Sequence, residues 1–469
     1  MGGPSDVRRI IVALLAVVLL AGAAGYAVAD AKDVVPGILT IPAPIPTGLA
    51  PAPQPIPPVP VAEAPALDPA ALEAALLPVL GSAALGPNVG VVVRDATSEQ
   101  ILYSRAADQP RVLASLQKLL ASVTLATALD LDATMTTKAV VGSTPGDVVL
   151  VAGGDTLLAS GAGDPDDVVG RAGLADLAAQ VDAAAPAGPL TLHLDATYAA
   201  GPRTVSTWSP SDVALGYTRG VAQIGLADLR PIRGRVPAVE TDEDVMTAFA
   251  DALRALGRTV DVPGDAALSE PVAANAKVLG SVASAPYIEV IGHALAESDN
   301  AIYENLTRQA MVKEGEPIPA DGVTGPYLMS HLEHADIAIA GVDIKDASGL
   351  SPGQTAPLTV VDAVLARAVG GDAPRLRRII AELPVAGLSG TLAERFGAGD
   401  TRSAAGIPRA KTGSLTGVSA LGGTTVDAQG RLLTFAVVSN SVPPNGPGTK
   451  GAREALDRFA AVLTACGCR

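Results

Sequence analysis

The two ends of the globular part of this 469-residue chain carry mirrored sets of secondary-structure patterns. An expected helix and two strands open this part, whereas an expected hairpin and a helix close it. The ranges are 69–80, 88–95, 100–103, 418–426, 432–440 and 451–464. Helix–strand–strand at one end and strand–strand–helix at the other predict one antiparallel sheet that both ends build and helices cover. The expected fold class is therefore α+β.

The middle of the chain has a different pattern. Residues 141–284 mix short strand-like runs with turns rich in Gly, Pro and Asp, which is typical of one or two inserted modules. The sheet-forming domain is then expected to comprise 69–140, which includes an apolar helical segment at 114–129, together with 285–469. Length alone predicts about three domains of roughly 150 residues each. The patterns refine this estimate to one domain interrupted by inserted modules and preceded by a linker.

An uncharged stretch of 20 residues, 10–29, follows Arg8 and Arg9. This length spans a bilayer and favours a membrane anchor, with the preceding residues in the cytoplasm. Ala27-Val28-Ala29 also matches a cleavage site, so 1–29 is either a cytoplasmic tip with an anchor or a cleaved signal peptide. Residues 30–68 are rich in Pro and Ala and are expected to form an extended extracytoplasmic linker. Both alternatives predict an exported protein, anchored through 10–29 or secreted after cleavage.

The charge balance excludes one large class of partner. Asp and Glu outnumber Lys and Arg by 48 to 33, which gives a formal net charge of −15. Nucleic acid is not expected as a partner, because phosphate binding needs basic patches. The two cysteines, Cys466 and Cys468, are too few for a disulfide-stapled scaffold or a zinc cluster. A tight disulfide between them and free or partner-bound thiols are both open.

The first motif whose residues suit catalysis is Ser115-Leu116-Gln117-Lys118, at the start of the apolar segment. On a helix, residues three apart share a face, so the Lys118 ammonium can reach the Ser115 hydroxyl. A serine is a weak nucleophile until a base takes its proton, and a partly desolvated lysine can be that base. Because such pairs also arise by chance, the motif indicates a nucleophile only together with others.

Two further motifs lie towards the C-terminus. Ser298-Asp299-Asn300 offers a hydroxyl that can relay a proton and an amide that can hold a carbonyl, although a plain helix cap uses the same residue types. Lys411-Thr412-Gly413-Ser414 leads into the expected hairpin. Its lysine and hydroxyls suit a carboxylate, its glycine permits close approach, and the Ser414 N–H can face an oxyanion. An ordinary strand end is the alternative interpretation.

Ser-x-x-Lys, Ser-Asp-Asn and Lys-Thr-Gly in this order are the signature of β-lactamases and penicillin-binding proteins. The long separation of Ser115 and Ser298 resembles the D-alanyl-D-alanine carboxypeptidases/endopeptidases, the class C low-molecular-mass penicillin-binding proteins, which are serine peptidases. Three further segments resemble this family: 146–157, 346–351 and 383–392. The resemblance implies a β-lactamase/transpeptidase-like domain, an antiparallel sheet covered by helices, with large inserted modules between the first two motifs.

The resemblance also implies an acyl-enzyme mechanism on peptidoglycan peptides, with no cofactor and no metal ion. Ser115 would attack the carbonyl between two D-alanines, or in a D-amino-acid cross-link, with Lys118 as general base and the Lys411 charge assisting. Ser298 would pass the proton to the leaving amine, and Asn300 would bind the peptide. β-Lactam antibiotics would acylate Ser115 as substrate mimics.

Further substrate contacts follow from the same resemblance. Lys411, Thr412 and Ser414 would hold the terminal carboxylate beside Gly413, and the N–H groups of Ser115 and Ser414 would form an oxyanion hole. Asp195 resembles an acidic position that meets the side-chain amine of the wall peptide in some members, and a turn or cap residue is the alternative.

Competing interpretations are weaker. The segment 349–353 matches the Gly-x-Ser-x-Gly sequence motif of α/β-hydrolases. That fold needs a catalytic histidine after the serine, and no histidine follows Ser351 in the chain. His331-Leu332-Glu333-His334 lacks the spacing of a zinc protease, and we interpret both histidines as surface residues. A non-enzymatic alternative keeps the fold in a catalytically silent wall-binding or scaffolding protein.

Overall fold

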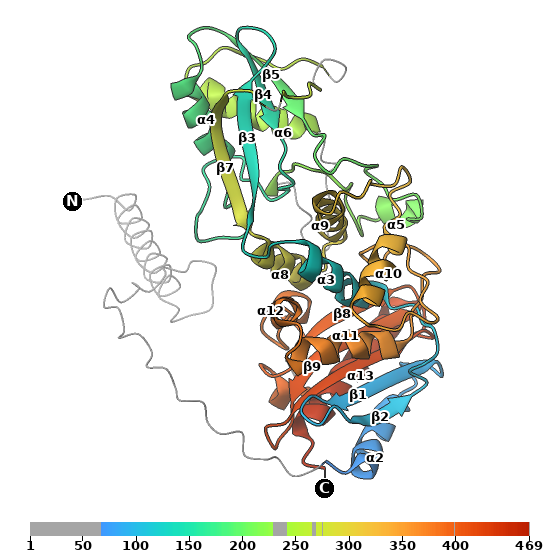
Figure 1. Ribbon diagram of the computed structural model, residues 1–469. Coiled ribbons are helices and arrows are strands. Elements are labelled where there is room, and N and C mark those ends of the chain that lie inside the picture. Colours follow the sequence, from blue (N-terminus) through green and yellow to red (C-terminus); the bar gives the residue numbers. More distant parts are fainter. Residues whose placement is uncertain (1–66, 228–241, 265–268, 274, 398, 469) are drawn as a thin grey trace, which may run out of the picture. The chain divides into compact units, whose positions relative to one another are not determined.

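The computed structural model describes residues 67–227, 242–264, 269–273, 275–397 and 399–468 (Figure 1). The expected anchor or signal at 1–29 and nearly all of the linker at 30–68 lie outside the described residues. In the part of the chain that is described, no helix combines the length and apolarity needed to cross a membrane.

The first sheet is built from both ends of the described chain. Its strand order is β2-β1-β10-β9-β8, and all neighbours are antiparallel. The strands are β1 (Val89–Asp95), β2 (Ile101–Arg105), β8 (Arg409–Leu415), β9 (Val418–Val426) and β10 (Leu432–Ser439). The predicted α+β fold with a shared antiparallel sheet is therefore confirmed. The strand that carries the Lys-Thr-Gly motif, β8, lies at the edge of this sheet.

Helices cover both faces of the first sheet. Val91 and Val93 of β1 join the core formed with α2 (Pro69–Leu80) and α13 (Gly446–Ala465). Val92 points the other way, as the two-residue period of a strand requires, into the core formed with α3 (Gln117–Ala128) and α11 (Leu358–Gly370). This second core also contains α8 (Tyr287–Glu297), α9 (Asn300–Lys313), α10 (Gly325–His334) and α12 (Pro374–Ala381).

Local capping explains where the terminal helices begin. The Asp68 carboxylate accepts a hydrogen bond of 2.9 Å from the Ala70 N–H, and α2 starts at Pro69 as predicted. Helix α13 starts at Gly446, earlier than the predicted 451, because Asn445 caps it by accepting from the Gly448 N–H at 2.8 Å.

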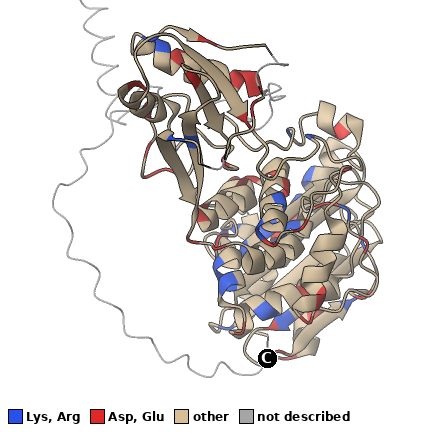
Figure 2. Cartoon of the chain, turned by 45° about the horizontal axis from the view of Figure 1, so that its top comes forward, with Lys and Arg blue, Asp and Glu red and all other residues tan. Residues whose placement is uncertain are grey.

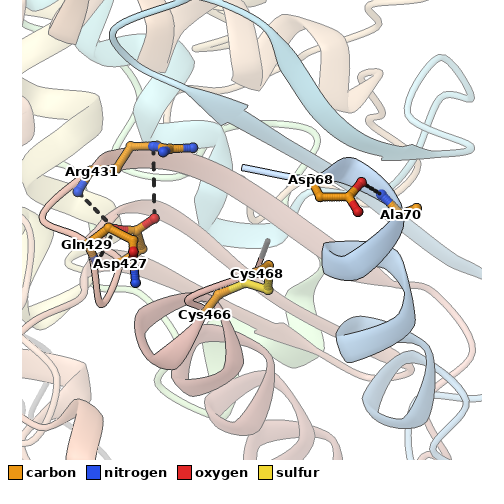
Figure 3. The surroundings of a disulfide bond; sticks show 7 residues. All are labelled: Asp68, Ala70, Asp427, Gln429, Arg431, Cys466 and Cys468. Atoms are coloured by element: carbon orange, nitrogen blue, oxygen red, sulfur yellow. Dashed lines mark hydrogen bonds and ion pairs between the residues drawn. A yellow bond between two sulfur atoms is a disulfide. The ribbon is translucent and has the colours of Figure 1, made fainter. Parts of the chain in front are cut away.

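The cysteines after α13 lie close to the start of α2. Cys466 and Cys468 form a disulfide bond, which resolves the alternatives left open by the sequence (Figure 3). The Asp68 N–H donates to the Cys468 carbonyl at 3.2 Å. The start and the end of the described chain are thus held next to each other.

A second, mixed sheet has the order β6-β5-β4-β3-β7. Strands β3 (Thr134–Val141), β4 (Asp147–Val151) and β7 (Val278–Pro286) pair antiparallel, whereas β4 pairs in parallel with β5 (Leu190–Asp195) and β5 with β6 (Val260–Asp261). Helices α4 (Leu174–Ala184) and α6 (Asp242–Ala255) share a separate hydrophobic core with this sheet. Acidic residues are more prominent than basic ones on its elements (Figure 2).

Candidate active site

Ser115 lies in a short 3₁₀ turn, Ala114–Leu116, immediately before α3, rather than inside the predicted α-helix. Ala114 has a left-handed backbone with φ of 48°, which is rare for a residue with a side chain. Two glycines press against this turn. A Cβ at Gly413 would lie 2.9 Å from the Leu113 carbonyl, and one at Gly349 would lie 2.1 Å from the Ala114 carbonyl. The turn is therefore clamped between β8 and the loop that contains Gly349.

Lys118 is fully buried, and its ammonium points back at the turn. The Nζ atom donates to Asn300 Oδ1 at 2.5 Å, to the Ser348 carbonyl at 2.7 Å and to Ser115 Oγ at 3.3 Å. These three contacts use all three donors of an ammonium group. The half-buried Ser115 hydroxyl is thus in direct hydrogen-bonding reach of a lysine, as the three-residue spacing predicted.

Burial gives Lys118 the properties of a base. Desolvation lowers the pKa of its ammonium to about 8, against the opposing effect of the nearby carboxylates of Asp346, Asp299 and Glu304. With a pKa of about 8, roughly one molecule in ten carries a neutral amine at pH 7. An exposed lysine would offer far less, because its pKa lies near 10.4.

A second serine–lysine pair stands beside the first. Ser298 ends α8 with a left-handed backbone, φ of 59°, and its Oγ accepts a hydrogen bond of 2.8 Å from Lys411 Nζ. Lys411 lies on β8, is fully buried and also donates to the Thr412 carbonyl at 2.9 Å. Ser298 is half-buried, whereas Lys411 is fully buried.

Asn300 contacts Lys118 of the first pair and follows Ser298 of the second pair by two positions. It is the first residue of α9, directly after Asp299, whose carboxylate caps the helix by accepting from the Ile302 N–H at 2.8 Å. The cap interpretation is thus correct for Asp299 alone. The amide of Asn300 accepts from Lys118 and donates to the Tyr217 carbonyl at 2.8 Å.

The rest of the β8 motif lines the same edge. The Thr412 hydroxyl donates to Thr391 Oγ1 at 2.9 Å, and Gly413 packs on the Ser115 turn. Ser414 is exposed, and its Oγ accepts from Arg453 Nε at 3.4 Å. Thr391 and Arg453 were not among the predicted site residues; they reach the motif from η3 (Gly390–Leu392) and α13, which no local pattern in the sequence indicates.

Asp195 lies elsewhere, at the end of β5 in the second sheet. Its carboxylate accepts from the Thr197 N–H at 3.0 Å, from the Thr197 hydroxyl at 2.6 Å and from the Val272 N–H at 2.9 Å. Burial opposes ionisation, yet these hydrogen bonds hold the pKa of the carboxyl below its ordinary value. The contacts described for Asp195 stay within its own sheet, in the manner of a turn residue, and its predicted role towards the peptide stays a prediction.

The loop 346–351, outside the three motifs, supports the site. Asp346 is fully buried, and its carboxylate accepts from the Gly349 N–H at 2.7 Å and from the Trp208 indole at 3.0 Å. Glu304 of α9 accepts from the N–H groups of Ala347 and Ser348 at 2.8 and 3.0 Å. These bonds aim the Ser348 carbonyl at Lys118. The signal available in the sequence was the resemblance of 346–351 to a segment of the family.

Glu304 affects the proton affinity of the site as well as the position of the loop. Burial first, and the nearby Asp346 second, raise the pKa of the Glu304 carboxyl to about 8, while Arg308, the Ala347 N–H and Lys118 act against this rise. Glu304 therefore titrates in the same range as Lys118, and each group influences the proton affinity of the other.

The competing motifs are structural. Ser351 of the hydrolase-like segment 349–353 is fully buried and donates to Asp346 at 2.5 Å. The interpretation of both histidines as surface residues is wrong for His331, which is buried between Thr127 and Glu314 at 2.9 and 3.0 Å. His334 is exposed as expected.

Comparison with known proteins identifies this arrangement. The model of the D-Ala-D-Ala carboxypeptidase 3 (S13) family matches residues 72–229 and 227–463. The chain belongs to this family. Carboxypeptidase Rv3627c of Mycobacterium tuberculosis is 36% identical over 430 residues, covering 89% of this chain and 90% of that protein. Carboxypeptidase DacB of Mycolicibacterium smegmatis is 34% identical over 400 residues and covers 84% of each chain.

Solved structures agree in fold. Penicillin binding protein 4 (dacB) from Haemophilus influenzae superposes with a TM-score of 0.65 at 19% identity, covering 82% of this chain and 97% of that one. The predicted family is therefore confirmed, and this S13 member is a serine-type D-Ala-D-Ala carboxypeptidase, a hydrolase, as predicted.

Proposed function

We propose that this S13 carboxypeptidase cleaves peptidoglycan stem peptides through an acyl-enzyme on Ser115. Neutral Lys118 takes the proton from Ser115 Oγ, which lies 3.3 Å away, while the oxygen forms a bond to the carbonyl carbon of the penultimate D-alanine. The N–H groups of Ser115 and Ser414 hold the resulting oxyanion. The single observation that carries the proposal is the buried, pKa-lowered Lys118 in contact with a half-buried serine.

Departure of the terminal D-alanine requires a proton on its nitrogen. Ser298 passes to this nitrogen the proton that Lys118 took from Ser115, and the C–N bond breaks. Lys118 is then neutral again, while the Lys411 ammonium, 2.8 Å from Ser298 Oγ, keeps its charge. Asn300 binds the peptide backbone next to Lys118. Water then attacks the ester, Lys118 takes a proton from the water and returns it to Ser115 Oγ, and the peptide acid leaves.

Recognition of a free C-terminus favours carboxypeptidase over endopeptidase action. Lys411, Thr412 and Ser414 offer one ammonium and two hydroxyls along a single edge strand, which suits a carboxylate. The Arg453 guanidinium at Ser414 adds a second cationic donor. β-Lactams carry an equivalent carboxylate and a strained amide, so they acylate Ser115 and stay attached as inhibitors.

We also propose that the enzyme works outside the cytoplasm, anchored by 10–29 or secreted after cleavage. The uncharged stretch after Arg8 and Arg9 supports export. The Cys466–Cys468 disulfide supports an oxidising compartment, because such bonds persist there. Detection of the intact N-terminus in the membrane fraction supports an anchor, whereas a mature protein that starts at residue 30 supports a cleaved signal.

Labelling with a fluorescent penicillin tests the central proposal. The wild-type protein should carry one covalent label on the peptide that contains Ser115, and it should release D-alanine from a pentapeptide ending in D-Ala-D-Ala. Folded wild-type protein that takes no label would contradict the mechanism, and so would a label on another serine. Comparing this peptide with a cross-linked dimer measures the balance between carboxypeptidase and endopeptidase action.

A further inference from the structure

Outside the active site, three side chains with metal-binding atoms meet on one face of the second sheet. Asp147 begins β4, and His193 lies on the neighbouring β5. Glu270 follows Ser269, which bridges to Leu194 on the other side of β5. Three adjacent segments of the sheet thus bring together one imidazole and two carboxylates, whose candidate ligand atoms all lie within 4.8 Å of one another.

The spacing of these atoms resembles a coordination shell more than a hydrogen-bonded pair. His193 Nε2 lies 3.8 Å from Asp147 Oδ1 and 3.6 Å from Glu270 Oε2. At 3.8 and 3.6 Å, both separations are too long for a hydrogen bond, unlike the His331–Glu314 contact at 3.0 Å. Two ligands bound at about 2.0–2.2 Å to one tetrahedral zinc ion lie about 3.4 Å apart, so small side-chain shifts suffice.

The two carboxylates are fixed through their other oxygen atoms. Asp147 Oδ2 accepts from the Thr144 N–H at 3.0 Å and from its hydroxyl at 2.5 Å. Glu270 Oε1 accepts from the Ser143 N–H at 3.0 Å. The turn between β3 and β4 therefore holds both groups with Oδ1 and Oε2 towards His193, which is the role that outer-shell donors have in metal sites.

Burial and charge favour a cation there. The side chains of His193, Asp147 and Glu270 are 13%, 12% and 22% exposed, so the carboxylates are partly removed from solvent. Two carboxylates this close repel each other, and a divalent ion cancels the repulsion. One nitrogen and two oxygen ligands suit Zn²⁺ better than Mg²⁺ or Ca²⁺, which prefer oxygen alone.

We propose that Asp147, His193 and Glu270 form a structural Zn²⁺ site in the second sheet, with water as the fourth ligand. The ion would tie the segment around Glu270 to β4 and β5. The same segment donates the Val272 N–H to Asp195 at 2.9 Å, so the ion would act together with that contact. The ligands lie far apart in the chain, and for this reason no sequence motif predicted them.

Calorimetric titration of the full-length protein with ZnCl₂ tests this site. The titration is done without reductant, so that the Cys466–Cys468 disulfide stays closed. The wild type should bind one Zn²⁺, and His193→Ala should weaken binding at least about 100-fold. The control His334→Ala removes an exposed histidine and should bind Zn²⁺ like the wild type.

A second variant and a second readout keep the test decisive. Glu270→Gln keeps the shape of the side chain but removes a charged ligand, so it should weaken binding even if His193→Ala fails to fold. Thermal unfolding should shift upward with Zn²⁺ in the wild type and in His334→Ala, but not in Glu270→Gln. Equal Zn²⁺ affinity in the wild type and both site variants, or no binding by the wild type, would overturn the proposal.

Discussion

The polar groups around Ser115 join helices, a loop and the first sheet, whereas the Asp195 carboxylate bonds to segments of its own sheet. Lys118 contacts residues 182 and 230 positions away, and Lys411 contacts Ser298 across 113 positions. Asp195, in contrast, accepts two of its three hydrogen bonds from Thr197, two positions away. The comparison indicates that folding brings distant residues together to form the reaction centre in the first region. In the second region, the hydrogen bonds of Asp195 stabilise the sheet itself.

The largest effect that follows from this comparison belongs to Ser115→Ala. Loss of the nucleophile should abolish penicillin labelling and reduce D-alanine release by at least about 10⁴-fold, with the unfolding temperature nearly unchanged. Mass spectrometry of the labelled protein and a turnover assay measure both. Ser351→Ala is the matched control, because it removes a buried serine that only supports the loop; it should lose stability but keep the label.

Lys118→Met should be the next most severe change. It keeps the apolar stem but removes the base, so the rate of acylation should fall by about 10²–10⁴-fold. The exposed Lys313 offers the control Lys313→Met, which should acylate like the wild type. Acylation at the wild-type rate in Lys118→Met would exclude lysine as the base.

The pH dependence of acylation reports on the same group. Because only neutral Lys118 accepts the Ser115 proton, the rate should rise with pH and level off above the pKa of about 8. Below that pKa the rate should fall about tenfold per pH unit, since the neutral fraction does so. Stopped-flow acylation between pH 5.5 and 9.5 measures this profile, and a flat profile contradicts the assignment.

Thr412→Val should have a moderate effect. It removes the hydroxyl proposed to hold the substrate carboxylate, together with its bond to Thr391. The loss of one hydrogen bond, about 1–1.5 kcal/mol, should raise KM about tenfold while kcat changes little. The exposed Thr416→Val, in the turn that follows β8, is the control and should leave KM unchanged.

Asp195→Asn should affect activity least and stability more. Three hydrogen bonds to a partly buried carboxylate weaken, which should cost about 1–3 kcal/mol of unfolding free energy, measured by urea denaturation. The exposed Asp261→Asn should cost almost nothing. A rise in KM confined to peptides with a side-chain amine would instead place Asp195 at the substrate and break the contrast between the two regions.

The sequence predicted those parts of the fold that local patterns encode. The first sheet came from short runs with clear periods and caps, as at Asp68, and the motifs placed Ser115 and Lys118 three residues apart. Periodicity could not reveal that Ser115 precedes α3 in a 3₁₀ turn, because both helix types read alike over one turn. Burial of His331 was missed, since its partners are distant in the chain.

The supporting groups of the site could not be predicted for the same reason. The Ser348 and Tyr217 carbonyls act as backbone atoms, so the identity of their side chains carries no signal. Thr391 and Arg453 come from elements whose position depends on how the chain folds back on β8. The parallel pairing of β4 and β5 likewise depends on a crossover and not on either strand alone.

The hydrogen bond from the Asp68 N–H to the Cys468 carbonyl has a practical consequence. The described chain therefore enters and leaves its fold at neighbouring positions. Tension applied through the residues before Asp68 would reach α2 and the turn after α13 first. Within the described residues, Ser115 and both lysines are held by contacts with other elements, so the bond between Asp68 and Cys468 takes no direct part in positioning the reaction centre.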